Sequence, residues 1–433
     1  MMNEDAPTTA CPIEQAVLLF KSVYGHRPIV LAFSGGMDST VLLHALVKQG
    51  LTPKMVHVHH GLQAIADDWV LHAQQQAAHF GVECHIERIQ LADRSRRGME
   101  DLARSARYTA LWQQVPNQGV LLTAHHQRDQ AETVLLRLLR GAGVKGLAAI
   151  HTEQSFDHQR CLYRPLLPVS YEAMLGYAQR HQLSWVEDPT NQQAVALRNQ
   201  IRHGLLPTMR ELQPAFEQKL AQTALHCQEA DALLMEMASE DWQKIHLSEH
   251  CWSLTLWQSL SWPRARQALA YRLTMLGESV TVAQWQQVKQ QFYQRVSSQT
   301  HPELCLSQHK LVLADDKGYC LPLSWLVTPA EQTLSLTLHT QQLVWAPWLS
   351  LALNVKQGSL TVRIKPRQGG EKVSVDGKMR SLKSWLQKAH IPHWQMAHWP
   401  VIYDEQGQLF GWPGMPLHWW RKGMECEVIF PGC

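Results

Sequence analysis

Short apolar runs alternate with helical patterns along the chain up to about residue 190. The strand-like runs are apolar and partly β-branched, as expected of buried strands; they lie at 28–33, 54–59, 82–87, 119–124 and, shorter, at 183–187. Between them, apolar residues recur with helical spacing at 40–47, 67–80, 98–115 and 127–140. Such repeated strand–helix units predict an α/β fold, a doubly wound, mostly parallel sheet with helices on both faces. Ligands should then bind beyond the carboxyl ends of the strands.

The pattern changes after this region. Residues 198–245 have a continuous amphipathic helical pattern, and 246–325 predict a smaller unit with helices near 263–276 and 281–296. Residues 328–342 are weakly patterned, which predicts a linker. We therefore expect a small helical domain to follow the α/β domain.

The last part of the chain predicts a β-rich domain. Turn residues stand at 367–370 and 376–377, and one short helix is expected at 381–389. The expected domains are 1–215, 216–327 and 343–433.

Composition narrows the class of protein. The 433 residues are 45% hydrophobic, enough for folded cores, and no apolar run is long enough to span a membrane. Residues 1–7 are polar and acidic, unlike a secretory signal. The nine cysteines are scattered and never form C-x-x-C, which favours reduced thiols in a cytoplasmic protein over a structural zinc or iron–sulfur site. With a net charge of only +3, any nucleic-acid surface must be local.

A glycine-rich turn joins the first strand to the following helix. Its backbone N–H groups can approach an anion closely, and the helix N-terminus favours negative charge there. Asp38 is unusual in such a turn, because a carboxylate repels phosphate unless a cation lies between them; a bound Mg²⁺ explains it. The expected nucleotide-binding residues are Ser34, Gly35, Gly36, Met37, Asp38 and Ser39.

This turn is not one of the common nucleotide loops. GxxxxGK[ST] does not occur in the chain, so transfer of the γ-phosphoryl group is disfavoured. Ser-Gly-Gly-x-Asp-Ser resembles the loop of the PP-loop ATP pyrophosphatases. That resemblance implies a Rossmann-like ATPase domain that cleaves ATP between the α- and β-phosphates and adenylates a substrate.

Charged side chains on two predicted helices are further candidates. Asp129 and Glu132 share one helix face near its N-terminus, where they can hold Mg²⁺ or an ammonium ion, or merely favour the helix dipole. Arg104 and Arg107 share a face of another helix. They suit phosphate recognition or stabilisation of a pentavalent phosphorus, or form an ordinary exposed basic face.

Histidines also cluster at two strand ends, at 57–60 and 125–126. Without paired cysteines or an HExxH motif, ordinary hydrogen bonding is favoured over a metal cage, and one such histidine can stack on adenine.

Taken together, these segments resemble the tRNA(Ile)-lysidine synthetases over nearly the whole chain. The matching segments are 34–39, 57–62, 100–108, 123–133, 140–147, 164–167, 187–191, 198–202, 367–371, 380–383 and 391–394. The loop at 34–39 is specific to the superfamily alone, whereas its combination with 187–202 and 367–400 is specific to this branch.

The resemblance implies a reaction and roles for particular residues. ATP adenylates C2–O of the wobble cytidine in the CAU anticodon of tRNA(Ile), and the ε-amine of free L-lysine then displaces AMP. The product, lysidine, changes codon reading from AUG to AUA. Asp38 would support Mg²⁺, Arg107 would act in catalysis, and Asp129 with Glu132 would bind the lysine ammonium or deprotonate it. Arg104, Arg198 and Arg202 would contact phosphate or tRNA.

The resemblance also makes the later domains tRNA-binding modules. Eight basic residues lie within 26 positions and can track phosphates: Arg363, Lys365, Arg367, Lys372, Lys378, Arg380, Lys383 and Lys388. Arg367, Arg380 and Lys383 are the expected tRNA contacts. Trp385 and Trp394 can stack on bases, although core packing is commoner for tryptophan. The oligomeric state stays open, a homodimer being one arrangement.

One position departs from the family's pattern. Members often carry two acids before the glutamine, as in His-x-Asp-Asp-Gln, and here the first is Arg128. Helical spacing turns Arg128 away from the face of Asp129 and Glu132, so we expect the chemistry to survive.

Three other functions remain to be separated from this one. tRNA 2-thiolation uses the same loop but needs cysteines, commonly as C-x-x-C. GMP or asparagine synthesis needs a glutaminase domain or an N-terminal nucleophilic cysteine, and neither is visible. An ATP-sensing or RNA-binding protein would give no ATP–pyrophosphate exchange, and the joint presence of Asp38, Asp129 and Glu132 disfavours it.

Overall fold

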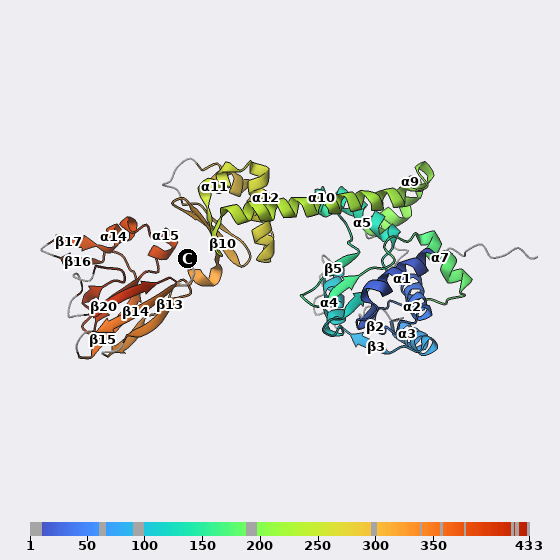
Figure 1. The fold of residues 1–433 in the computed structure, drawn as a ribbon, viewed down its shortest axis with the longest axis horizontal. Helices are drawn as coiled ribbons and strands as arrows, with labels where there is room; N and C mark the ends of the chain where they lie inside the picture. The colour runs from blue at the N-terminus through green and yellow to red at the C-terminus, as the bar shows by residue number, and fades with distance from the viewer. Residues whose placement is uncertain are drawn as a thin grey trace, which may run out of the picture. The chain divides into compact units, whose positions relative to one another are not determined.

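The computed structural model divides into two compact units, Met1–Ala232 and Leu233–Cys433 (Figure 1). It describes residues 11–59, 66–89, 99–187, 197–295, 301–337, 340–355, 358–375, 378–416, 420 and 424–430. The division falls inside one helix, and each unit is considered by itself below. The three-part division expected from the sequence stays a prediction.

The first unit is built on a six-stranded sheet with the order β3-β2-β1-β4-β6-β5. All pairings are parallel except that of β5 with β6, which is antiparallel. The strands are β1 (Ile29–Ala32), β2 (Lys54–His59), β3 (Cys84–Arg88), β4 (Val120–Leu122), β5 (Glu153–Ser155) and β6 (Cys161–Tyr163). The predicted α/β fold with a mostly parallel sheet is confirmed.

Helices cover both faces of this sheet. Neighbouring residues on a strand point to opposite faces, and because both sets of side chains are apolar here, each face needs a covering layer. Leu31 packs with α1, α2, α3 and α7, whereas Val30 packs with α4. The helices are α1 (Pro12–Tyr24), α2 (Met37–Lys48), α3 (Ala66–Phe80), α4 (Met99–Gln113), α5 (Gln127–Leu139), α6 (Val144–Leu147) and α7 (Tyr171–Arg180).

The strand order places the site. From β1 the chain builds outward through β2 and β3, and β4 then returns to the other side of β1. In open parallel sheets, ligands bind at such a switch point, beyond the carboxyl ends of the two strands. Here these ends lead into the 34–39 loop and into the segment that begins α5.

The fifth parallel strand differs from the expected one. Residues 183–187 form no strand; instead the N–H of Val186 donates to the carbonyl of Gly35 at 3.0 Å. The fifth parallel strand of the sheet is instead β6, which pairs with β4 and has only three residues. A run that short carries too little periodicity to be recognised from the sequence.

The long helical stretch after residue 197 is broken once. It consists of α8 (Leu197–Gln200), a π-helical turn η2 (Ile201–Leu205), α9 (Leu206–Leu212) and α10 (Phe216–Ile245). Pro214 lies in the break, where its ring and missing N–H interrupt helical hydrogen bonding.

The second unit begins with a five-stranded sheet of order β7-β8-β11-β10-β9, packed on one face against helices. Its strands are β7 (His246–Ser248), β8 (Cys251–Ser253), β9 (Glu303–Cys305), β10 (His309–Ala314) and β11 (Lys317–Pro322). Its helices are α11 (Leu254–Ser259), α12 (Trp262–Met275), α13 (Val282–Gln287), the π-helical η3 (Val288–Tyr293) and the 3₁₀ turn η4 (Leu323–Leu326). The two helices predicted near 263–276 and 281–296 are confirmed.

The rest of the unit is rich in antiparallel strands, as predicted. The sheets are β12-β15-β18-β19, β13-β14-β20 and β16-β17. Their strands are β12 (Gln332–Leu336), β13 (Gln341–Ala346), β14 (Leu349–Val355), β15 (Leu360–Pro366), β16 (Lys372–Val375), β17 (Lys378–Ser381), β18 (Pro400–Asp404), β19 (Leu409–Gly411) and β20 (Met424–Ile429). The short helix predicted at 381–389 is α14 (Leu382–Lys388), and α15 (His393–Met396) follows it. The turn expected at 376–377 lies outside the described residues.

The segment expected to be a linker contains β12, which pairs with β15. Leu334 and Leu336 alternate with polar residues there, a strand pattern too short to stand out. One buried core also joins side chains of β10 and β11 to those of β14 and β15. These two parts of the second unit therefore pack as one body.

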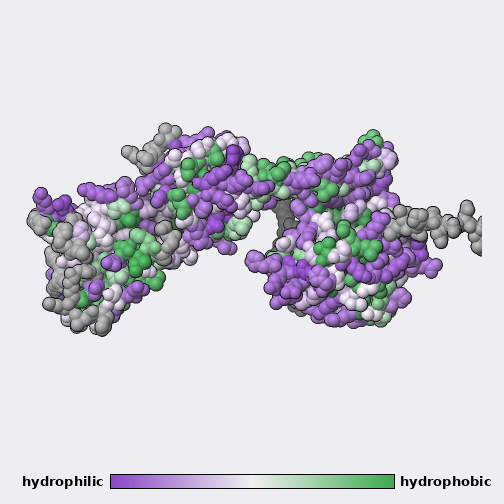
Figure 2. All heavy atoms as spheres, viewed as in Figure 1, coloured by the Kyte–Doolittle hydropathy of each residue, from purple (hydrophilic) through white to green (hydrophobic). Residues whose placement is uncertain are grey.

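Several large apolar side chains are exposed on the surface of the described residues. Figure 2 shows green patches in the region of α10, in keeping with the exposure of Leu225 and Leu233 on that helix. Within the described ranges, no helix is long and apolar enough to cross a membrane.

Candidate active site

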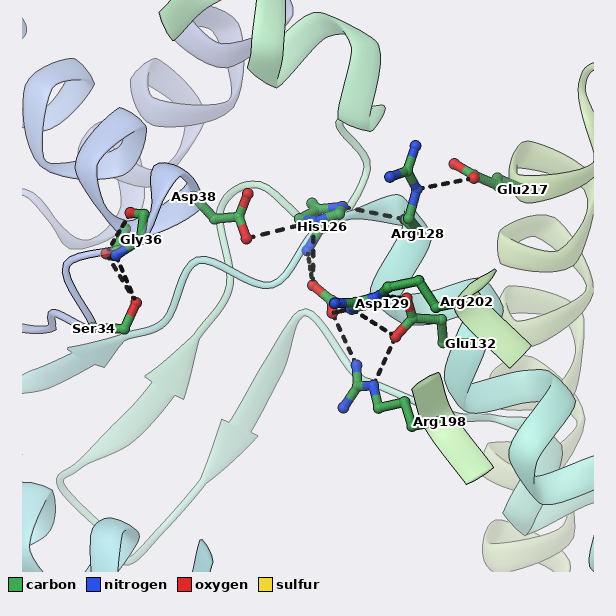
Figure 3. A network of polar contacts seen from close by, with 11 residues as sticks. Ser34, Gly36, Asp38, His126, Arg128, Asp129, Glu132, Arg198, Arg202 and Glu217 are labelled. Carbon is green, nitrogen blue, oxygen red and sulfur yellow. Dashed lines mark hydrogen bonds and ion pairs between the residues drawn. The ribbon is translucent and has the colours of Figure 1, made fainter. Parts of the chain in front are cut away.

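The loop between β1 and α2 leaves the start of the helix open to an anion. Gly36 is the N-cap of α2, so no N-cap side chain occupies the first N–H groups of the helix. The Ser34 hydroxyl accepts from the N–H of Gly36 at 3.3 Å and lies 3.2 Å from the Ser39 hydroxyl (Figure 3). Gly35 has φ +87°, and a Cβ there would lie 2.9 Å from Cγ2 of Val186. The loop therefore requires glycine at this position.

Asp38 projects from the first turn of α2 toward α5 (Figure 3). Its Oδ2 lies 3.7 Å from Nε2 of His126, while its Oδ1 is buried without a hydrogen-bond partner. Burial raises the pKa of this carboxyl, and the charge of Asp129 raises it further, against the effect of His126. A hard carboxylate oxygen that lacks a partner beside a phosphate-binding loop fits a Mg²⁺ ligand.

His126 connects the loop acid to the acids of α5. It is the N-cap of α5, and its Nδ1 accepts from the N–H of Arg128 at 3.3 Å. The remaining ring nitrogen, Nε2, then lies 3.7 Å from Asp38 and 3.6 Å from Asp129. Hydrogen bonding was the role expected of the strand-end histidines. His57 and His125 also show it, toward the Phe33 carbonyl at 3.0 Å and the Thr123 hydroxyl at 2.9 Å.

Asp129 and Glu132 lie on one face of α5, and two arginines bind them. Nε and Nη2 of Arg198 donate to Glu132 at 2.6 Å and to Asp129 at 2.8 Å. Arg202 donates to both oxygens of Glu132 at 2.6 and 3.0 Å. The Glu132 side chain is fully buried, so these pairs replace its hydration. The partners are 66 to 70 residues apart in sequence, and no local pattern indicates that they meet.

The carboxylates of Asp129 and Glu132 differ in how accessible their oxygens are to a ligand. Glu132 has both oxygens occupied by guanidinium groups, whereas the Asp129 side chain is 13% exposed. Burial would raise the pKa of Asp129, but His126, the Arg198 guanidinium and the backbone N–H of His126 together lower it to about 2. Asp129 is therefore ionised near neutral pH, which suits it to hold a cation better than to take up a proton.

The α4 arginines lie along the same edge of the sheet. Both Arg104 and Arg107 are exposed, and the Arg104 guanidinium lies 5.2 Å from the ring centre of Tyr108. The charge of Arg104, added to burial, helps lower the pKa of His125 to about 4. The charge of the exposed Arg104 therefore acts on His125, which lies just before α5.

Sequence reasoning missed the part played by His126. A residue that caps a helix and is followed three positions later by an acid forms a capping box, and this signal was available: the N–H of His126 donates to Asp129 at 3.0 Å. The pattern fixes the cap, but it does not show that the ring also reaches Asp38.

The basic stretch of the second unit contains both partly buried and exposed side chains. Arg363 donates to the Glu405 carbonyl at 3.0 Å, Lys365 lies 3.2 Å from Glu331, and Arg367 lies 3.6 Å from Glu371. The exposed members are Lys372, Lys378, Arg380, Lys383 and Lys388. Among the predicted contacts, Arg380 and Lys383 are therefore on the surface, and Arg367 is only 17% exposed.

The two tryptophans of this region belong to the interior. Trp394 is buried in the core of the second unit, and Trp385 packs partly buried against the same core. Core packing, the commoner outcome for tryptophan, applies to Trp394.

Known proteins resemble the chain along most of its length. Residues 10–209 match the PP-loop domain family, and residues 362–419 match the TilS substrate C-terminal domain. The tRNA(Ile)-lysidine synthase of Hydrogenovibrio crunogenus is 34% identical over 88% of this chain and 92% of its own length. That of Pseudomonas aeruginosa is 35% identical over 89% of this chain and 90% of its own.

A likeness to a solved structure is much weaker. The U34-tRNA thiolase NcsA from Methanococcus maripaludis has 15% identity and a TM-score of 0.42, over 51% of this chain and 81% of that one. A similarity at this level supports no inference.

Proposed function

The chain belongs to the tRNA(Ile)-lysidine synthase family, and from this premise we propose that it joins free L-lysine to C2 of the wobble cytidine in the CAU anticodon of tRNA(Ile). ATP is converted to AMP and pyrophosphate, and codon reading changes from AUG to AUA. The observation that carries the proposal is the meeting of Asp38 with Asp129 through His126 at the switch point of the sheet.

The first step is adenylation of the cytidine. The O2 atom attacks the α-phosphorus of ATP, and the bond to the β-phosphate oxygen breaks as pyrophosphate leaves. The open N–H groups of α2 and the hydroxyls of Ser34 and Ser39 orient the phosphates, as expected of residues 34–39. Arg104 and Arg107 add positive charge near the phosphates.

Asp38 is the residue that would hold Mg²⁺. When bound, the ion would neutralise phosphate charge beside this loop. Its unpartnered, buried Oδ1 supports this assignment.

In the second step the lysine amine attacks C2 and AMP leaves. The ε-ammonium must first release a proton to solvent water, because an ammonium group has no lone pair for attack. We propose that Asp129 holds the ammonium by charge, since its low pKa makes it a weak proton acceptor. Glu132 keeps Arg198 and Arg202 in place around it, so we place these two arginines at the lysine site.

The second unit would bind the body of the tRNA. Its exposed Arg380 and Lys383, with Arg367 nearby in sequence, support contacts to the phosphate backbone. The eight described cysteines are all free thiols, which supports action in the reducing cytoplasm. A homodimer remains one arrangement to test by light scattering.

The test is incorporation of labelled lysine into an unmodified tRNA(Ile) transcript with a CAU anticodon, with ATP and Mg²⁺. We expect incorporation by the wild-type protein and loss of at least about a hundredfold in Asp38→Ala, as for a group that acts on transition-state charge. Pyrophosphate release without lysine incorporation would indicate another nucleophile. If neither product forms, the chain binds ATP or RNA without this chemistry.

A further inference from the structure

Arg128 points away from Asp129, the residue that follows it, and into a second cluster of charges. Its Nε lies 3.2 Å from a Glu217 oxygen at the start of α10, and its Nη2 lies 3.3 Å from Glu172 in the first turn of α7. Its guanidinium carbon lies 3.7 Å from the ring centre of Tyr171. Figure 3 shows the Arg128–Glu217 pair apart from the ion pairs of Asp129.

Partners are needed to keep Arg128 in this place. A cation in the first turn of a helix is unfavourable, because the helix N-terminus already carries partial positive charge. The Arg128 side chain is only 16% exposed, so water screens it little. Glu217 is buried to a similar degree and needs a counter-charge, which Arg128 and Arg210 share. The Tyr171 face adds a cation–π contact.

The charge cluster around Arg128 contacts the helical run from α8 to α9, which carries Arg198 and Arg202. The run begins with Arg198 on α8 and Arg202 on η2, which bind the two carboxylates of α5. It ends with Arg210 on α9, which shares Glu217 with Arg128. The first turns of α5 are therefore linked to both ends of the α8–α9 run. One face of α5 binds Arg198 and Arg202, and the other, through Arg128 and Glu217, is linked to Arg210.

We propose that Arg128 is a positioning residue for the lysine site: through Glu217 and Tyr171 it fixes the α9–α10 corner so that Arg198 and Arg202 meet the α5 carboxylates in one geometry. This role rests on the proposed function. Its loss should weaken the affinity for lysine and leave adenylation, which uses the 34–39 loop, nearly unchanged.

The test is a charge-reversal cycle with Arg128→Glu, Glu217→Lys and the double variant in the full-length protein. The lysine KM and kcat, the tRNA-dependent ATP–pyrophosphate exchange rate without lysine, and the melting temperature are measured for each. We expect Arg128→Glu to raise the lysine KM about tenfold, with exchange within about twofold of wild type. The double variant should recover most of the lysine KM. Arg128→Gln is the milder variant if Arg128→Glu does not fold.

The matched control is Glu172→Gln. This carboxylate also pairs with Arg128, but it is 63% exposed, so its removal should leave the lysine KM unchanged.

Three results would overturn the proposal: an unchanged lysine KM in Arg128→Glu and Arg128→Gln, an equal loss in exchange and lysine transfer, or no recovery in the double variant. If the wild-type protein transfers no lysine, the proposed function itself fails and this role falls with it. If wild type transfers lysine and the cycle shows no coupling, the role of Arg128 alone is wrong.

Discussion

At the scale of single residues, the site depends on a few atoms whose partners are unusual. Gly35 adopts a φ that side-chain-bearing residues rarely use, Asp38 has an oxygen without a partner, and Glu132 is buried between two guanidinium groups. The unpartnered oxygen of Asp38 and the buried charge of Glu132 each have a cost in free energy that binding or ion pairing must offset, whereas glycine at position 35 avoids the strain that a side chain would bring. Substitutions at these positions should therefore change different measurable properties, such as ATP affinity or the free energy of unfolding.

Gly35→Ala should weaken ATP binding. The new Cβ would meet Val186 at 2.9 Å with φ near +87°, and such strain costs about 1–3 kcal/mol. Isothermal titration with ATP and a thermal melt measure the two effects. Gly50→Ala is the matched control, because Gly50 also has positive φ (+73°) but nothing lies within 4 Å of its Cβ position. Equal ATP affinity in both variants would contradict the argument.

Glu132→Gln should destabilise the first unit. It removes the negative charge that two guanidinium groups share, and loss of one partner of a buried ion pair costs about 3 kcal/mol. Urea unfolding monitored by tryptophan fluorescence gives the change in free energy. Asp157→Asn breaks the exposed pair with Arg160 and should change stability little. Similar midpoints for the two variants would show that Arg198 and Arg202 do not depend on Glu132.

At the scale of elements, side chains fix loops where the backbone has no regular pairing. Glu278, just after α12, accepts from Ser307 N and Oγ, from Gln308 N and from His309 Nδ1, at 2.6 to 3.0 Å. Burial would raise the pKa of Glu278, but these donors lower it from its ordinary value of 4.5 to about 2. The ionised carboxylate therefore anchors the turn between β9 and β10.

Glu278→Gln should destabilise the second unit by about 2 kcal/mol at neutral pH, the value of a few hydrogen bonds to a charged group. Because the folded pKa lies below the unfolded one, the contribution is complete above about pH 4.5 and is lost as the pH falls through about 2. The stability difference between wild type and variant, measured by denaturant unfolding, should shrink over that range. A constant difference would mean that the carboxylate charge is not what holds the turn.

At the scale of the whole molecule, the proposed catalytic residues and the exposed basic residues belong to different units. Asp38, Asp129 and Glu132 lie in the first unit, whereas the exposed basic residues of β16, β17 and α14 lie in the second. Phosphate contacts add affinity without base specificity and release counterions. Charges on the second unit should then act on tRNA binding and not on ATP.

Neutralising Lys372, Lys378 and Lys383 together to glutamine should weaken tRNA binding and flatten its salt dependence. Each lost phosphate contact should reduce the slope of log K against log salt concentration by about 0.7–0.9. Filter binding at several salt concentrations measures the slope, and ATP titration should be unchanged. Lys317→Gln, an exposed lysine of the same unit, is the control. An unchanged slope in the triple variant would place the tRNA contacts elsewhere.

The sequence by itself determined the local elements and the chemical type of the loop. Periodicity located β1, β2 and the helices α2, α3 and α5, because each buries one face and repeats its apolar positions accordingly. Helical spacing also predicted that Asp129 and Glu132 share a face and that Arg128 turns away, as the structure shows. These properties depend on neighbours a few positions away, so the sequence is enough.

Only the tertiary structure decided which distant side chains meet. The pairs of Arg198 and Arg202 with Glu132, the contact of Val186 with Gly35 and the strand β6 all join segments far apart in sequence. No local pattern encodes such contacts, because they arise when the sheet order and the α8–α10 run bring these segments together. For this reason the candidate site residues could be proposed from the chain, whereas their partners, and with them their charge states, required the fold.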